Sequence, residues 1–177
     1  MLETQSIALI GYRGTGKTTV AQRLAMRLGW DWIDADVELE LRAGKSIAAV
    51  FADDGEAAFR KLEAAVVAEL CRRREVVIAL GGGAVLRDDN RQVIAQCGAV
   101  VWLRASVDAI LGRLATDPTT AGRRPNLTNA NPRNEIEQVL AVRTPIYRAC
   151  ATLEVDTEDK APAEIADEIS TALGIAT

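Results

Sequence analysis

The chain has 177 residues, of which 49% are hydrophobic and 26% are charged, as expected for a soluble globular protein. Its net charge of −4 argues against nucleic acid or an anionic membrane surface as a partner, and no apolar run is long enough to predict a transmembrane helix. The sequence contains no histidine, which excludes imidazole catalysis and most zinc sites.

The cysteines and the N-terminal residues indicate a cytoplasmic protein. Cys71, Cys97 and Cys150 are odd in number and widely spaced, so we expect free thiols and not disulfides or metal ligands. The first residues lack the basic and then apolar pattern of a secretion signal.

A phosphate-binding motif stands near the start of the chain. The apolar run 7–10 predicts a buried parallel strand, and residues 11–18 fit the pattern G-x-x-x-x-G-K-[ST]. Val20, Leu24 and Leu28 then follow at helical spacing. The motif therefore lies in the strand, loop and helix context that it requires, and it predicts binding of a nucleoside triphosphate.

Each residue type in this loop suits a polyphosphate. Gly14 and Gly16 allow the backbone N–H groups, including those of Thr15 and Thr19, to approach the phosphates closely at a helix N-terminus. Lys17 can reach the β- and γ-phosphates, and the Thr18 hydroxyl can bind Mg²⁺.

Apolar strands and amphipathic helices alternate through the remaining chain. This alternation predicts an α/β fold with a parallel sheet, and the lack of a linker predicts one domain over 1–177. The further strands are expected at 31–34, 76–80, 99–103 and 153–155, and the further helices at 37–43, 47–51, 56–73, 88–96, 107–114, 135–151 and 163–173.

Two carboxylates come at the end of the second predicted strand. Asp34 is a candidate for the Mg²⁺ shell, because the strand 76–80 ends in glycine and supplies no acid; helix capping and simple solvation are the alternatives. If the backbone stays extended, Asp36 points the same way and can orient or deprotonate a hydroxyl acceptor. Asp36 is equally suited to capping a helix that begins near Val37.

The glycines Gly81, Gly82 and Gly83 follow the strand 76–80. They either form a plain tight turn or let a ligand approach backbone N–H groups closely.

Arg143 occupies a position in the apolar stripe of the helix 135–151. A cation at such a position is expected to be paired, to bind an anion, or to extend over the edge of the core. Pro145 is expected to kink or end this helix.

The segment 116–134 has no periodic apolar pattern and is long for a connection, which predicts a lid. It contains Arg124, which would stabilise the charge on a transferring phosphoryl group if the lid closes over it. A solvated basic turn is the alternative.

Taken together, these features resemble the shikimate kinase family over nearly the whole chain. Besides the phosphate loop, the resemblance rests on Asp34-Ala-Asp36, on 44–51, on 55–60 with Glu63, on 80–84, and on Arg124-Pro125 and Arg143 with Tyr147.

The resemblance implies a three-layer α/β/α fold with a five-stranded parallel sheet ordered 2-3-1-4-5. It implies transfer of the ATP γ-phosphate to the 3-hydroxyl of shikimate, with Mg²⁺, in aromatic amino-acid biosynthesis, by a monomer. Residues 34–62 would hold the acceptor. The implied site residues are Gly14, Thr15, Gly16, Lys17, Thr18, Thr19 and Arg124 for ATP, Thr18 and Asp34 for Mg²⁺, Lys17, Asp36 and Arg124 for catalysis, and Asp36, Arg60, Gly81, Gly82, Gly83 and Arg143 for shikimate.

The sequence departs from the family pattern in two places. Family members often have an arginine near the adenine, where this sequence offers only Lys160, so Lys160 is the implied ATP contact there, and the lid is a few residues longer. Two other functions stay open at this point: a kinase for gluconate or a nucleotide, and a non-catalytic ATP-binding switch.

Overall fold

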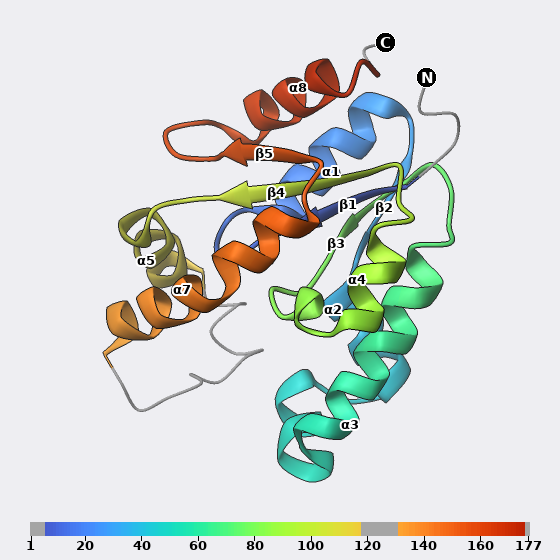
Figure 1. Ribbon diagram of the computed structural model, residues 1–177, viewed down its shortest axis with the longest axis vertical. Coiled ribbons are helices and arrows are strands. Elements are labelled where there is room, and N and C mark those ends of the chain that lie inside the picture. The colour runs from blue at the N-terminus through green and yellow to red at the C-terminus, as the bar shows by residue number, and fades with distance from the viewer. Residues whose placement is uncertain (1–5, 118–130, 176–177) are drawn as a thin grey trace.

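The computed structural model describes residues 6–117 and 131–175, so most of the predicted lid, including Arg124, lies outside the described residues. Its centre is a five-stranded sheet in the order β2-β3-β1-β4-β5, in which all neighbouring strands are parallel (Figure 1). The strands are β1 Ile7–Ile10, β2 Asp31–Asp34, β3 Val76–Ala79, β4 Ala99–Arg104 and β5 Leu153–Asp156. The predicted fold class and strand order are confirmed.

Helices cover both faces of this sheet and make three layers (Figure 1). The short apolar strands are buried from both sides, which is why they appear in the sequence as continuous apolar runs. The helices are α1 Lys17–Leu28, α2 Ala35–Ala43, α3 Ile47–Leu70, the 3₁₀ turn η1 Ala84–Leu86, α4 Asp88–Ile94, α5 Val107–Thr116, α7 Pro132–Cys150 and α8 Pro162–Ala172.

Alternate side chains of each strand enter two separate cores. Leu9 and its neighbours on one face pack against α1 and α8, and Ile10 and its neighbours on the other face pack against α2, α3, α4 and α7. A third, smaller cluster joins the phosphate loop to α5 and α7 through Tyr12, Ile110 and Ile136. This third cluster holds the start of α7 beside the phosphate loop.

The region after β2 differs from the sequence prediction. The chain does not stay extended to Asp36, because α2 begins at Ala35. Asp34 and not Asp36 is the cap, since its carboxylate accepts hydrogen bonds from the backbone N–H groups of Asp36 and Val37. Asp36 therefore lies in the first turn of a helix, where a carboxylate is favoured by the helix dipole.

The predicted helices at 47–51 and 56–73 are one element, α3, with a break at Gly55. Ser46 caps its start by accepting from the N–H of Ala49. Gly55 has φ 83° and ψ 171°, a conformation that glycine adopts without steric cost. The helix ends at Leu70 and not at Arg73.

Pro145 does not end α7, which continues to Cys150. The proline removes one backbone donor, so the carbonyl of Ala141 loses its usual partner. Both residues lie on the exposed side of the helix, where water can hydrogen-bond to this carbonyl. Burial of Ile136 before the proline and Tyr147 after it explains why the helix persists.

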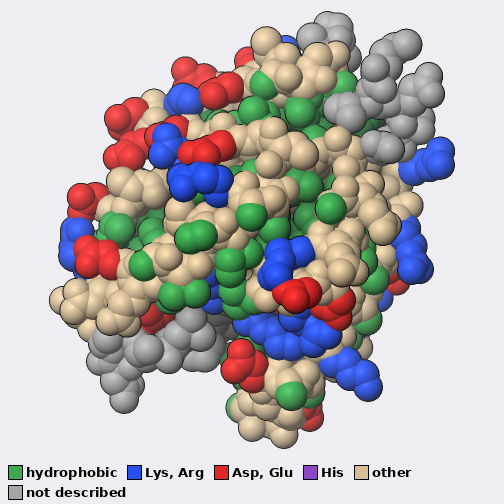
Figure 2. Space-filling view, viewed as in Figure 1, with side chains coloured by type: hydrophobic (Ala, Val, Ile, Leu, Met, Phe, Trp, Pro, Cys, Tyr) green, Lys and Arg blue, Asp and Glu red, His purple; other side chains and the backbone are tan. Residues whose placement is uncertain are grey.

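The three cysteines are free thiols. A hydrogen bond with Cys97 and burial together raise the pKa of Cys71, and burial raises that of Cys150. Among the helices of residues 6–117 and 131–175, none is both long and apolar enough to span a membrane. Acidic and basic side chains intermingle on the face shown in Figure 2.

Candidate active site

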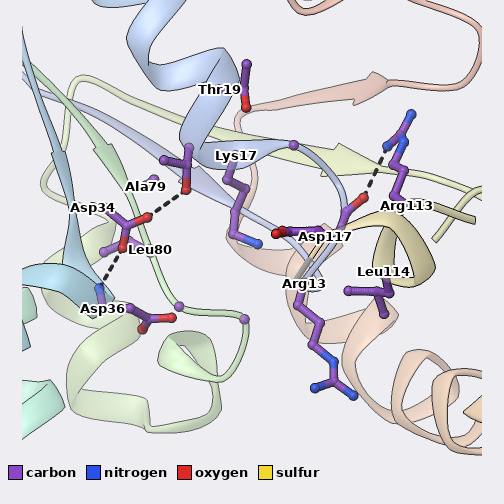
Figure 3. Close-up of a pocket in the computed structure, with 15 residues that line it drawn as sticks. Arg13, Lys17, Thr19, Asp34, Asp36, Ala79, Leu80, Arg113, Leu114 and Asp117 are labelled. Carbon is purple, nitrogen blue, oxygen red and sulfur yellow. Dashed lines mark hydrogen bonds between the residues drawn. The ribbon is translucent and has the colours of Figure 1, made fainter. Parts of the chain in front are cut away.

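The carboxyl ends of β1, β2 and β3 open into a cavity of about 250 Å³ (Figure 3). This edge is where parallel sheets of α/β proteins bind ligands. The cavity combines the phosphate loop, the two aspartates after β2, the glycines after β3 and the end of α5. Its lining residues are Arg13, Gly14, Gly16, Lys17, Thr18, Thr19, Asp34, Asp36, Ala79, Leu80, Gly81, Gly82, Arg113, Leu114 and Asp117.

The phosphate loop wraps closely around the end of β1. A Cβ atom on Gly11 would stand 2.3 Å from the carbonyl oxygen of Leu103, so only glycine fits there. Thr15 is buried and its hydroxyl donates to the Tyr12 carbonyl, at 2.8 Å. The Thr15 side chain thus points away from the cavity, and only its backbone can serve a ligand there.

Lys17 stands between the two halves of the cavity (Figure 3). Its Nζ donates to the carbonyls of Gly11 and Tyr12, at 2.8 Å each. These bonds hold the ammonium group over the loop, beside the space that the loop N–H groups surround. A triphosphate in this loop would offer Lys17 stronger, charged acceptors.

The two predicted metal-binding side chains touch each other. The Thr18 hydroxyl donates to Oδ2 of Asp34 at 2.6 Å, while Oδ1 of the same carboxylate caps α2. Capping by Asp34 is therefore observed at one oxygen, while the other oxygen faces the phosphate loop and its role toward Mg²⁺ stays a prediction.

Asp36 lines the same cavity on the side of Asp34 (Figure 3). It reaches this position from the first turn of α2 and not from an extended strand end. The helix start places its carboxylate across the cavity from Arg113.

The triple-glycine loop brings the two predicted carboxylate-binding arginines together. A Cβ atom on Gly83 would stand 2.7 Å from Nη1 of Arg60, and one on Gly82 would stand 3.6 Å from Nη1 of Arg143. Gly81 and Gly82 line the cavity that contains Lys17. Both guanidinium groups therefore lie at the loop that bounds the cavity.

Packed neighbours hold Arg60 and the triple-glycine loop in place. Arg60 donates to the buried carboxylate of Glu63 at 2.7 Å and to the Gly83 carbonyl at 3.4 Å. The buried hydroxyl of Tyr147, one helical turn after Arg143, donates to the Gly82 carbonyl at 2.6 Å. The loop is thus held by α3 on one side and α7 on the other.

Comparison with known proteins agrees with this geometry. The family model for shikimate kinase matches residues 13–174. A shikimate kinase of Rhodopirellula baltica is 46% identical over 168 residues, covering 95% of this chain and 90% of that protein. A solved structure, the shikimate kinase of Acinetobacter baumannii in complex with shikimate, is 36% identical with a TM-score of 0.90, covering 97% of this chain and 94% of the other.

The chain belongs to the shikimate kinase family.

Members of the shikimate kinase family are ATP-dependent phosphotransferases that act on a hydroxyl of shikimate. A gluconokinase of Sinorhizobium meliloti shares the fold at a TM-score of 0.61 and 21% identity, covering 97% of this chain and 92% of the other. That degree of likeness concerns the fold alone. The non-catalytic switch considered from the sequence has no support in this family assignment.

The sequence patterns did not indicate two arginines of the cavity. Arg113, on α5, donates to the Gly14 carbonyl at 3.3 Å and to both oxygens of Thr157, at 3.0 and 2.9 Å. Arg13, in a variable position of the phosphate loop, lines the cavity as well. The only sequence signal for Arg113 was its place on the helix that follows β4.

The assignment of Lys160 to an ATP contact stays a prediction from the sequence. Lys160 pairs with Glu168 at 2.6 Å and is not among the residues that line the cavity. Arg113 joins the phosphate loop to the residue that follows β5, through Gly14 and Thr157.

Proposed function

We propose that this chain transfers the γ-phosphate of ATP to the 3-hydroxyl of shikimate, with ATP in the phosphate loop and shikimate at the triple-glycine loop. One observation carries the proposal: the guanidinium groups of Arg60 and Arg143 meet the loop whose first glycines share a cavity with Lys17 and Asp36. An acceptor with one carboxylate and several hydroxyls needs such cations on one side and a carboxylate on the other.

The phosphate loop holds the donor in this proposal. The backbone N–H groups from Gly14 to Thr19 surround the phosphates, and Lys17 leaves the loop carbonyls to bind the β- and γ-phosphates. Arg113 borders the nucleoside side. Arg124 and most of the lid are outside the described residues, and their role over the γ-phosphate remains the prediction made from the sequence.

The acceptor is held at the opposite wall. Arg60 and Arg143 bind the shikimate carboxylate, and backbone groups of Gly81, Gly82 and Gly83 bind along the ring. Asp36 accepts a hydrogen bond from the 3-hydroxyl and takes its proton as the oxygen attacks the γ-phosphorus. The bond from the γ-phosphorus to the β,γ-bridging oxygen breaks, and ADP leaves.

The residues at the loop suit Mg²⁺. Thr18 and Asp34 present a hydroxyl and a carboxylate 2.6 Å apart. No group of three or more His, Cys, Asp or Glu side chains that could hold a metal occurs in residues 6–117 and 131–175. Two protein oxygens are sufficient for Mg²⁺, which takes its other ligands from substrate phosphates and water. When bound, Mg²⁺ would neutralise charge that develops on the phosphate oxygens.

The proposal also covers the domain organisation, the oligomeric state and the cellular location of the protein. One kinase domain over 1–177 would present residues 34–62 to the acceptor and close a lid, about 116–134, over ATP. We place this enzyme in the cytoplasm as a monomer; its free thiols support a reducing compartment.

The test is a substrate panel. Purified protein with ATP and Mg²⁺ is given shikimate, gluconate or a nucleoside monophosphate, and ADP release is followed by a coupled assay. We expect ADP release only when shikimate is the acceptor. Phosphorus-31 nuclear magnetic resonance should show that the product carries its phosphate on the 3-oxygen. Faster release with gluconate, or equal release without any acceptor, would refute the proposal.

A further inference from the structure

Arg13 extends from the phosphate loop away from Lys17 and Asp36 (Figure 3). It occupies a variable position of the G-x-x-x-x-G-K-[ST] pattern, so phosphate binding does not require an arginine there. Its side chain is only 20% exposed, and its Nη2 stands 3.3 Å from Oε1 of Glu135, which is 122 positions later in the chain.

Glu135 is the more unusual member of this pair. Its side chain is 2% exposed, although it lies in the first turn of α7, three residues from the helix start. Burial of a carboxylate is costly unless a cation and hydrogen bonds compensate it. Arg13 supplies the cation, and the positive end of the α7 dipole adds to it. The fold therefore retains a partly buried ion pair between the phosphate loop and α7.

The same helix carries Arg143. Two helical turns, about 12 Å at the standard rise, separate Glu135 from Arg143. One turn further, Tyr147 donates to the Gly82 carbonyl. The helix is thus held to the phosphate loop at Glu135 and to the glycine loop at Tyr147, and Arg143 lies between these two points.

The two loops also touch each other directly. A Cβ atom on Gly82 would stand 3.2 Å from the Gly11 carbonyl oxygen and 3.6 Å from the Arg13 backbone nitrogen. Little space is left for one loop to move without the other. A shift of the phosphate loop is therefore transmitted to α7 through Arg13 as well as to the glycine loop.

We propose that Arg13 is a positioning residue: through its ion pair with Glu135 it ties the phosphate loop to α7, so that a nucleotide in the loop strengthens the hold of Arg143 on the acceptor. The inference rests on the proposed function, because it takes shikimate as the acceptor. By linkage, the acceptor strengthens nucleotide binding by the same factor. This role acts through Glu135 and α7, and it requires no contact between Arg13 and either substrate.

The experiment measures shikimate affinity by isothermal titration calorimetry, without nucleotide and with saturating ADP and Mg²⁺. The proteins are the unaltered chain, Arg13→Ala, Glu135→Gln and the double variant. We expect ADP to tighten shikimate binding in the unaltered chain by about 5- to 10-fold. Each single variant should lose most of this gain. The double variant should lose no more than the single variants, because both act on one contact.

Glu137→Gln is the matched control. Glu137 lies on the same helix two residues after Glu135, is 50% exposed and pairs with Arg133, so its removal should leave the ADP effect unchanged. All titrations are run well below the Tm of each variant, and circular dichroism checks the fold. A lower Tm with the full ADP effect would show a merely structural pair and overturn the proposal.

Two further outcomes also decide against it. If Arg13→Ala weakens shikimate binding equally with and without ADP, and does so again in the Glu135→Gln background, Arg13 contacts the substrate directly. If ADP has no effect in the unaltered chain, there is nothing for the ion pair to transmit. Failure of the unaltered chain to bind shikimate at all would instead refute the proposed function.

Discussion

At the scale of single residues, Asp34 uses its two oxygens for different tasks. Oδ1 accepts from the N–H groups that start α2, and Oδ2 accepts from the Thr18 hydroxyl. Asparagine caps helices as well as aspartate does, but it carries no charge. We expect Asp34→Asn to keep the free energy of unfolding nearly unchanged and to lower kcat by about 100-fold or more, as for loss of one charge-stabilising group.

Asp34→Ala separates the two tasks. It removes the cap as well as the charge, so the free energy of unfolding should fall by a further ~1 kcal/mol while kcat falls about as far as in Asp34→Asn. Urea unfolding and steady-state kinetics at saturating ATP and shikimate measure these effects. Retention of kcat in Asp34→Asn would show that the carboxylate serves only to start α2.

At the scale of elements, the glycine loop lies close to the arginine that α3 holds beside it. A Cβ atom on Gly83 would stand 2.7 Å from Nη1 of Arg60, which Glu63 holds at 2.7 Å. We expect Gly83→Ala to displace the guanidinium and raise the shikimate KM by about 10- to 100-fold, while the KM for ATP changes little. Initial-rate kinetics with each substrate varied in turn measure both constants.

Gly112→Ala is the control for this substitution. Gly112 is an exposed interior residue of α5 with no atom within 4 Å of its Cβ position, so alanine should raise the free energy of unfolding by about 0.5–1 kcal/mol and leave both KM values unchanged. A Gly83→Ala enzyme with the normal KM for shikimate would mean that Arg60 does not bind the acceptor.

The elements were largely predictable because their signals are local. Strands buried on both faces, such as β1 and β3, appear as apolar runs. The edge strand β2 is more exposed, and it was still predicted with its observed bounds. The start of α2 was not predicted, since the choice between Asp34 and Asp36 as cap depends on backbone geometry. The cavity residues Arg13 and Arg113 were missed because the sheet brings their partners from distant positions: Glu135 and Thr157 follow them by 122 and 44 residues.

At the scale of the whole molecule, the two proposed substrate regions lie at one edge of the sheet, and α7 contacts both loops. Ligand binding should therefore stabilise the entire fold and not a single element. Shikimate at about 100 times its Kd adds ~2.7 kcal/mol to the free energy of unfolding. For a chain of this size, each kcal/mol raises the Tm by about 2–4 °C, so thermal unfolding should shift by about 5–11 °C.

The Arg143→Ala variant tests whether that stabilisation depends on the carboxylate of the acceptor. Loss of a charged pair worth about 1.5–3 kcal/mol weakens shikimate binding by about 10- to 100-fold. At the same shikimate concentration the Tm shift should then fall to about half or less, because only one to ten times the new Kd is present. Differential scanning fluorimetry with shikimate, ADP or gluconate measures the shifts, and ADP should still stabilise the variant fully. An unchanged shikimate shift in Arg143→Ala would place the acceptor carboxylate away from α7.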